Sequence, residues 1–220
     1  MPSCHCEATD RHFTIPRAQD ELATYRRRGP TGTARIMLQC LAELGSAPTS
    51  LLDVGAGIGV LHHVLLDRGV RSAVHLEASS AYVEVASGES ARRGHGGRVT
   101  FHHGDLVALK DTLLPADLVT LDRVVCCYPE LEPLIRASAG KAVRYYALSY
   151  PHDRWYMRGH TWFENSRRRR SGNAFRTFVH PVACIRALVE EAGFTVVCVQ
   201  RTPVWEVVVG RRDDARRRSA

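Results

Sequence analysis

Apolar positions along the chain follow two alternating patterns. Short, nearly continuous apolar runs, typical of buried strands, occupy residues 50–54, 72–76, 98–102, 117–121, 142–148, 194–200 and 204–209. Segments with apolar residues three and four positions apart, typical of helices packed on one face, occupy residues 17–28, 33–44, 59–66, 79–93, 129–139 and 181–192. This alternation predicts an α/β fold with a seven-stranded, mostly parallel sheet and helices on both faces. The last two runs are joined by a short link, which predicts an antiparallel last strand.

The ends of the chain lack this pattern. Residues 1–16 show little periodicity, and we expect them to be irregular. At 220 residues the chain is long enough for one domain with a single core. We divide it into an N-terminal extension with cap helices (1–46), a main domain (47–210) and a basic tail (211–220).

No targeting segment or membrane span is recognised in the sequence. No apolar run approaches the roughly 20 residues that a membrane span requires. The N-terminal residues lack a basic stretch followed by an apolar one, which is the pattern of a secretion signal. We therefore expect a cytoplasmic protein.

The net charge of +7 comes from two short basic runs. Residues 167–170 are four arginines, and residues 211–218 carry five arginines against two aspartates, so the rest of the chain is neutral. Nucleic-acid-binding proteins usually cluster basic residues over one face of the fold. The distribution therefore disfavours nucleic acid as a partner, and the run at 167–170 is the best argument for it.

The seven cysteines are expected to be reduced, because their number is odd and no secretion signal precedes them. Cys40, Cys184 and Cys198 lie in apolar periodic stretches and are predicted to be small core residues. The run Cys-His-Cys at residues 4–6 could supply thiolate and imidazole ligands to zinc, but no second pair completes a set of four. We therefore predict a frayed terminus and no metal site.

The stretch LLDVGAGIGV, residues 51–60, joins an apolar run to a glycine-rich turn and then to a helix. Glycine in such a turn permits positive φ and lets a ligand approach the backbone. Asp53 lies just before the turn, whose alternate positions are Gly55, Gly57 and Gly59. Glu77 ends the second predicted strand, and the pair Gly104-Asp105 follows the third. This G-x-G-x-G spacing differs from the G-x-G-x-x-G of dinucleotide-binding dehydrogenases.

With these residues the chain resembles the class I S-adenosylmethionine-dependent methyltransferases. The resemblance implies that S-adenosyl-L-methionine is the cofactor, with the glycine turn along its methionine and ribose part. It implies that Glu77 holds the ribose hydroxyls and that Asp105 reaches the adenine amino group. In the family, N-terminal helices lie over the cofactor cleft, which makes Tyr25 and Arg28 candidates to touch the methionine end or the substrate. The full set of predicted cofactor contacts is Tyr25, Asp53, Gly55, Gly57, Gly59, Glu77, Ala78, Gly104, Asp105, Leu106 and Asp122.

The predicted exits of the fourth and fifth strands place further candidates beside the transferable methyl group, because ligands of open α/β sheets bind at the carboxyl ends of the strands. His152 has a suitable titration range for a general base, although an exposed loop histidine is an equally simple interpretation. Tyr128 is expected to contact ligands in the pocket. Cys126 and Cys127 are expected to pack, because no adjacent basic group would activate a thiolate.

The fourth-strand exit ending in Tyr-Pro, and residues 174–180, also resemble the magnesium-protoporphyrin O-methyltransferase branch. The chain departs from that branch at Cys127, where the branch has a histidine, so we do not predict a porphyrin substrate. Residues 152–177 form a predicted substrate cover that contains an arginine run together with Trp155, Tyr156, Trp162 and Phe163. Aromatic and arginine side chains together suit a flat or anionic small molecule, or the aromatic residues simply pack on the sheet.

We therefore predict an enzyme, an S-adenosylmethionine-dependent methyltransferase that acts on a small molecule, at oxygen. One alternative is a nucleic-acid methyltransferase, although the Asn/Asp-Pro-Pro-aromatic motif of amino-methylating enzymes is absent after the fourth strand. Another is a non-catalytic cofactor-binding protein of the same fold. A nicotinamide dehydrogenase is opposed by the glycine spacing and by Asp53. The sequence leaves the acceptor and the oligomeric state open.

Overall fold

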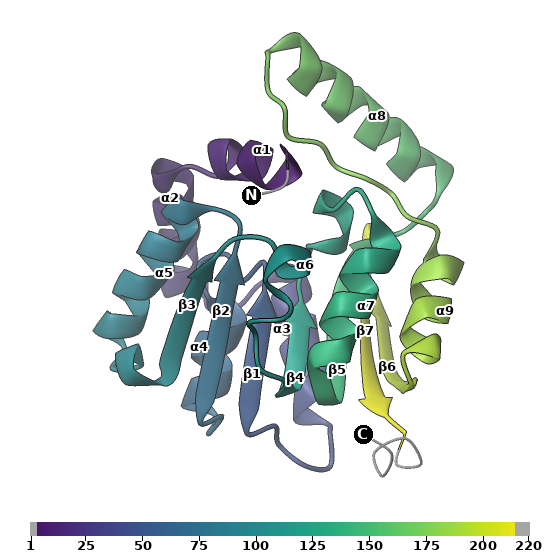
Figure 1. Ribbon diagram of the computed structural model, residues 1–220. Helices are drawn as coiled ribbons and strands as arrows, with labels where there is room; N and C mark the ends of the chain where they lie inside the picture. Colours follow the sequence, from purple (N-terminus) through teal and green to yellow (C-terminus); the bar gives the residue numbers. More distant parts are fainter. Residues whose placement is uncertain (1–3, 214–220) are drawn as a thin grey trace.

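The computed structural model describes residues 4–213 and, at residue 4, the backbone alone (Figure 1). Its centre is a seven-stranded sheet in the order β3-β2-β1-β4-β5-β7-β6. All neighbouring strands pair in parallel except β7, which is antiparallel to both β5 and β6. The strands are β1 Ser50–Val54, β2 Ser72–Glu77, β3 Val99–His103, β4 Ala116–Leu121, β5 Ala142–Pro151, β6 Phe194–Arg201 and β7 Trp205–Arg212. The predicted fold class is confirmed, including the antiparallel last strand.

Helices cover both faces of the sheet because apolar side chains of each strand alternate between the faces. Leu52 and Val54 pack with helices α6 (Leu106–Leu109), α7 (Leu131–Lys141) and α9 (Val182–Glu191). Leu51 packs on the opposite face with α3 (Gly32–Ala42) and α4 (Val60–Asp67). A third cluster joins α2 (Ile15–Arg28) to α5 (Ser80–Arg92) at the edge near β3. Two 3₁₀ turns complete the core elements, Gly96–Arg98 and Val125–Cys127.

The strand order reverses at β1, and this switch point positions the site. β1 pairs with β2 on one side and with β4 on the other, and Val54 lies in register with both Leu76 and Leu121. The carboxyl ends of these three strands therefore lie at the same edge. In open α/β sheets a crevice for ligands forms at such a point.

Two helices lie over this edge. Helix α1 (Cys4–His12) crosses above the carboxyl ends of the strands, and α8 (Trp155–Arg170) stands farther from the sheet (Figure 1). The prediction that residues 1–16 are irregular is wrong. Helix α1 has little periodicity of its own and is fixed by tertiary contacts: Asp10 accepts hydrogen bonds from the backbone and side chain of Ser80 at 2.7 and 2.8 Å.

The last strands extend further than predicted. β5 continues through Tyr150 to Pro151, since its backbone pairs with β7 as far as Trp205. The fifth-strand exit therefore begins at His152. β7 likewise continues to Arg212, so the strand includes the first two residues of the predicted basic tail. The remainder of that tail, 214–220, lies outside the described residues.

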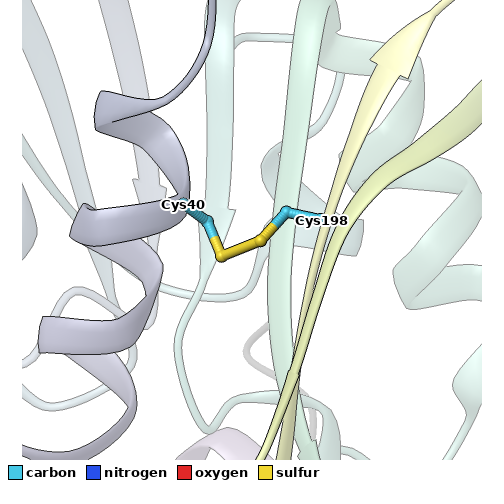
Figure 2. Close-up of a disulfide and its surroundings, with 2 residues drawn as sticks. All are labelled: Cys40 and Cys198. Atoms are coloured by element: carbon cyan, nitrogen blue, oxygen red, sulfur yellow. A yellow bond between two sulfur atoms is a disulfide. The ribbon is translucent and has the colours of Figure 1, made fainter.

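A disulfide joins α3 to β6 through Cys40 and Cys198 (Figure 2). The prediction of reduced thiols is therefore wrong for this pair. Cys40 is buried as predicted, whereas Cys184 is exposed on α9, so its assignment to the core is also wrong. The apolar periodicity of both segments is real, but it does not distinguish a packed thiol from a bridged one. In the described part of the chain, no helix combines the length and apolar character needed to cross a membrane.

Candidate active site

A cavity of about 660 Å³ lies at the carboxyl edge of the sheet. This volume is within the usual range for small-molecule sites, about 300–1,000 Å³. Its floor is formed by the ends of β1, β2 and β4 and the loops that follow them. Its roof comes from α1, the end of α8 and the extended chain after α8. The cavity therefore occupies the place that the strand order indicates.

The glycine turn after β1 forms part of the floor. Gly55 and Gly57 have φ of 59° and 58° and both line the cavity. A Cβ at Gly55 would overlap the side chain of Val124, so glycine is required there for close packing as well as for the turn. Gly59 (φ 84°) does not line the cavity; a Cβ there would overlap His62. The third glycine is explained by helix packing instead of by ligand approach, which leaves its predicted cofactor contact without support.

Glu77 lies at the end of β2 and lines the cavity. Its carboxylate accepts hydrogen bonds from the backbone N–H groups of Gly57 (2.9 Å) and Ser79 (3.0 Å). Burial raises the pKa of Glu77, and these backbone donors oppose the rise. The donors fix the carboxylate against the glycine turn. An ionised carboxylate has about four lone-pair positions, so it can still accept hydrogen bonds from a ligand's hydroxyl groups.

Asp105 begins the short helix α6, where its side chain accepts a hydrogen bond from the backbone N–H of Val107 at 3.0 Å. The hydroxyl of Tyr128 lies 3.1 Å from both carboxylate oxygens. Burial and the neighbouring Asp105 raise the pKa of Tyr128, so the phenol is a hydrogen-bond donor at neutral pH. Asp105 and Tyr128 therefore form one polar wall of the cavity. The other predicted contacts on this wall and floor are Ala78, Gly104, Leu106 and Asp122.

Asp53 does not line the cavity, contrary to its predicted cofactor contact. It lies on β1 between Leu52 and Val54 and therefore points to the opposite face of the sheet. There it is 1% exposed, accepts a hydrogen bond from Thr120 Oγ1 at 2.7 Å and lies 3.6 Å from His62 Nδ1. The alternation of strand side chains was sufficient to place it on this face.

Tyr25 and His152 also lie outside the cavity wall. Tyr25 on α2 stacks over His63 and lies beneath the guanidinium of Arg93. His152 is 9% exposed, and its Nε2 lies 2.9 Å from the carbonyl oxygen of Thr202. Since a carbonyl can only accept, Nε2 carries the proton in this contact. The structure therefore does not support Tyr25 as a cofactor contact or His152 as a general base.

A polar group under the roof includes His12, which was not predicted from the sequence. The His12 ring stacks on Phe175 at 4.3 Å, and its Nε2 lies 3.1 Å from an Arg17 nitrogen. Burial, assisted by the charges of Arg17 and Arg168, lowers the pKa of His12 to about 4, so the ring is neutral near pH 7. Arg167 and Asn173 line the same region. The lack of periodicity in residues 1–16 gave no signal for His12.

The four aromatic residues singled out in the predicted substrate cover do not line the cavity, whereas Phe175, in the extended chain after α8, does. Trp155, Trp162 and Phe163 are 84%, 70% and 57% exposed on α8. Only the end of that helix reaches the cavity, through Arg167 and Arg168. The basic part of the segment is therefore placed as the cover prediction requires, and the aromatic residues on α8 are not.

The loop after β4 brings two neighbouring thiols to the cavity. Arg123 has φ of 60°, a conformation that is uncommon for residues other than glycine. The 3₁₀ turn that follows places the Sγ atoms of Cys126 and Cys127 3.7 Å apart, and both residues line the cavity. Cys126 is buried as expected from a packing role, whereas Cys127 is half-buried at the cavity wall.

No protein-family model matches the chain, and no curated protein matches it. Solved structures do match. Magnesium protoporphyrin IX methyltransferase from Synechocystis PCC 6803 with bound SAH matches with a TM-score of 0.70 and 20% identity, over 95% of this chain and 100% of that one. An O-methyltransferase family 2 protein from Planctomyces limnophilus, in complex with apigenin, matches with a TM-score of 0.63 and 14% identity, over 89% and 62%.

A third match, the cyclase SpnF, has a TM-score of 0.61 and 12% identity, over 81% of each chain. The chain therefore has the Rossmann-like fold of the class I methyltransferases. At identities this low the likeness shows the fold, and the presence of a cyclase among the matches shows that the reaction has to be argued from the site.

Proposed function

We propose that the protein is an S-adenosyl-L-methionine-dependent methyltransferase that methylates an oxygen atom of a small anionic molecule. The observation that carries the proposal is the placement of two carboxylates, Glu77 and Asp105, along one cavity with the glycine turn. The fold supports the proposal, since the Synechocystis and Planctomyces proteins that share it are methyltransferases.

The residues present fit this cofactor. Glu77 is held by two backbone donors and would accept hydrogen bonds from the ribose hydroxyls. Asp105 would accept a hydrogen bond from the adenine amino group. Gly55 and Gly57 have no side chain, which leaves room for the ligand to contact the backbone of the turn. Asp122 lies at the end of the adjoining strand, where its carboxylate accepts a 2.6 Å hydrogen bond from Ser149 Oγ. When bound, the cofactor supplies an electrophilic methyl group on a sulfonium centre. The chain's own part is to orient that group and the acceptor, because the reaction depends on alignment.

Positive charge under the roof supports an anionic acceptor. Arg17, Arg123, Arg167 and Arg168 all line the cavity together with Asn173. Guanidinium groups bind carboxylates with two parallel hydrogen bonds, which also fixes the orientation of the bound group. A carboxylate is already deprotonated near pH 7 and requires no general base. This explains why a cavity without His152 in its wall still suits O-methylation.

A hydroxyl acceptor would make a different demand on the cavity. It would need a proton acceptor near the reacting oxygen, and His12 is a neutral imidazole at the cavity wall. A base with a pKa of about 4 is deprotonated throughout the range from pH 5 to 9. We therefore expect a rate that is independent of this group's titration across that range, whichever acceptor is used.

The proposal is tested by measuring S-adenosylhomocysteine formation with a panel of aromatic carboxylic acids, phenols and alcohols. Turnover with a carboxylic acid, and an increase of KM by about tenfold in Arg168→Ala through loss of a charge-assisted hydrogen bond, are the expected results. Arg169→Ala is the matched control, because Arg169 is exposed on the same helix and does not line the cavity. Cofactor binding without turnover on any acceptor would contradict methyl transfer, and binding of NAD alone would contradict the cofactor.

Three finer predictions also stay proposals. We propose that residues 1–46 and 152–177 act as cap and cover of the domain 47–210. Cytoplasmic location remains a prediction. Disulfides persist mainly in oxidising compartments, so the redox state of Cys40 and Cys198 bears on it. Chemical trapping of free thiols in intact cells would show whether these two cysteines are reduced there. A small-molecule acceptor instead of nucleic acid is proposed because the arginines line a cavity of about 660 Å³, a volume that suits a small molecule. Strongly salt-dependent binding of RNA would contradict it.

A further inference from the structure

The N-terminal Cys-His-Cys run brings His5 and Cys6, which the proposed function does not use, into a cluster with Asp105, which it does use. Helix α1 brings His5 and Cys6 against Asp105 at the start of α6. One ligand atom from each residue, a ring nitrogen, Sγ and a carboxylate oxygen, lies within 4.8 Å of the other two. His5 Nε2 and Cys6 Sγ are 3.6 Å apart. Three types of metal ligand, from two segments far apart in the sequence, therefore meet at one point of the cavity wall.

The surroundings of the cluster favour metal binding over a chance surface contact. Cys6 is 6% and Asp105 is 7% exposed. The His5 ring lies edge-on to Tyr128 at 4.3 Å, and the Tyr128 hydroxyl donates to Asp105, so the ring and the carboxylate are both positioned by the same phenol. Hydrogen bonds that orient metal ligands in this way are a regular part of metal sites. A cation bound here would compensate the charges of the buried carboxylate and of a thiolate beside it.

The ligand set matches zinc in kind and in dimensions. Thiolate, imidazole and carboxylate are its usual protein ligands, at about 2.0–2.3 Å, so neighbouring ligand atoms of a tetrahedral site lie about 3.3–3.8 Å apart. The 3.6 Å between His5 and Cys6 already fits this range. No two ligand atoms of the cluster are more than 4.8 Å apart. A shift of about 1 Å would therefore bring any pair to the separation of zinc ligands. That is within reach of side-chain rotation.

We propose that His5, Cys6 and Asp105 bind one zinc ion, with water in the fourth position. Zinc here fastens α1 to the end of β3 and thereby holds the roof over the cavity. Hydrogen bonds that these three side chains make in the metal-free state are exchanged for coordination. The proposal does not depend on the methyltransferase reaction, because it concerns metal content and the position of α1.

The test is zinc binding by the purified full-length protein after metal removal, measured by competition with a chromogenic chelator and by metal analysis after dialysis. One zinc per chain is expected, with the affinity lowered at least tenfold in His5→Ala and in Cys6→Ala. Matched controls are His160→Ala and Cys184→Ala, which remove an exposed histidine and an exposed cysteine far from the cluster. Both controls should bind zinc like the unsubstituted protein.

Two further measurements separate this site from other thiols and from misfolding. Cobalt(II) used as a probe should show thiolate-to-metal absorption that is lost in Cys6→Ala and kept in Cys127→Ala. Zinc should slow amide hydrogen exchange in residues 4–12 of the unsubstituted protein and not in His5→Ala, while both proteins keep the same melting temperature without metal. Absence of bound zinc, or zinc binding that survives both α1 substitutions and is lost in Cys127→Ala, would overturn the proposal.

Discussion

The polar groups at the carboxyl edge of the sheet and those on the face covered by α4 differ in how their hydrogen bonds are satisfied. On the cavity side, the carboxylates of Glu77 and Asp105 receive hydrogen bonds from backbone N–H groups and from Tyr128. On the side covered by α4, among the described residues, one Asp53 oxygen and both ring nitrogens of His62 and His75 have no hydrogen-bond partner. The cavity groups are arranged to meet a polar ligand, whereas the groups behind them are enclosed.

The position of each residue along its strand produces this difference. Asp53 on β1 is the direct neighbour of His75 on β2, so both side chains point towards α4. His62 and His63 on α4 then complete a buried cluster, in which His63 also lies 3.4 Å from His95. Glu77 lies two residues beyond His75, at the end of the strand, and there it meets the turn backbone. The comparison predicts that changes behind the sheet affect stability and that changes in the cavity affect binding.

The largest expected effect on the side of α3 and α4 is the loss of the Cys40–Cys198 disulfide. The bridge closes a loop of 158 residues. For a loop of this length, the chain-entropy model gives about 5 kcal/mol of stabilisation of the folded protein. Urea unfolding of Cys198→Ser beside the oxidised protein measures the loss. An equal loss on adding a reductant to the unsubstituted protein, and none on adding it to the variant, would attribute the effect to the bridge.

Acid should destabilise the same side of the molecule. Burial lowers the pKa of His63 to about 2 and that of His75 well below its usual value, and the neighbouring histidines lower both further. The unfolded chain takes up these protons near pH 6.5, so stability is present above that pH and is lost as the pH falls below it. Each group contributes up to about 1.4 kcal/mol per pH unit well below pH 6.5, and both together about 2 kcal/mol between pH 6.5 and 5.5, where the unfolded histidines are only partly protonated at the upper end.

The check is the free energy of unfolding measured from pH 7.5 to 5.0. His75→Phe should reduce the slope of the unfolding free energy against pH by about one proton, because it removes one of the two histidines whose pKa is lowered. The groups facing His75 are His62 and Asp53, and these are unchanged in the variant. An unchanged slope in the variant would show that His75 is not held neutral in the folded state.

A smaller effect is expected from Tyr128→Phe on the cavity side. The hydroxyl donates a hydrogen bond to Asp105 and so orients the carboxylate for a bound adenine. Its removal should cost about 1 kcal/mol of binding free energy, or about fivefold in affinity for S-adenosylhomocysteine. His152→Ala is the comparison, and its affinity and turnover should stay within about twofold since the ring lies outside the cavity wall. Equal losses in the two variants would contradict the placement of both residues.

The periodic part of the molecule could be predicted from the sequence. The seven apolar runs and the helices between them were placed with their ends within a few residues, because each strand and helix buries a regular set of positions. The glycine turn with Glu77 and Asp105 was placed correctly at the cavity for the same reason: a strand end, a tight turn and a helix start each have a local signal.

What the sequence did not predict depends on contacts between distant segments. Helix α1 is fixed by its contacts with Ser80 and Phe175, and neither of these leaves a trace in residues 1–16. The pairing of Cys40 with Cys198 needs the packing of α3 on the sheet. Asp53 was different, since alternation along β1 was sufficient to place it on the face opposite Leu52 and Val54.

The central claim is that the cavity binds the cofactor through Glu77 and that Asp53, one strand away, does not take part. Calorimetric titration with S-adenosylhomocysteine of the unsubstituted protein, Glu77→Gln and Asp53→Asn tests it directly. We predict micromolar binding that weakens at least tenfold in Glu77→Gln, through loss of charge-assisted hydrogen bonds to the ribose. Asp53→Asn should lower the melting temperature and leave the affinity within about twofold. Undiminished binding by Glu77→Gln, or loss of binding in Asp53→Asn at a temperature where it is folded, would contradict the account.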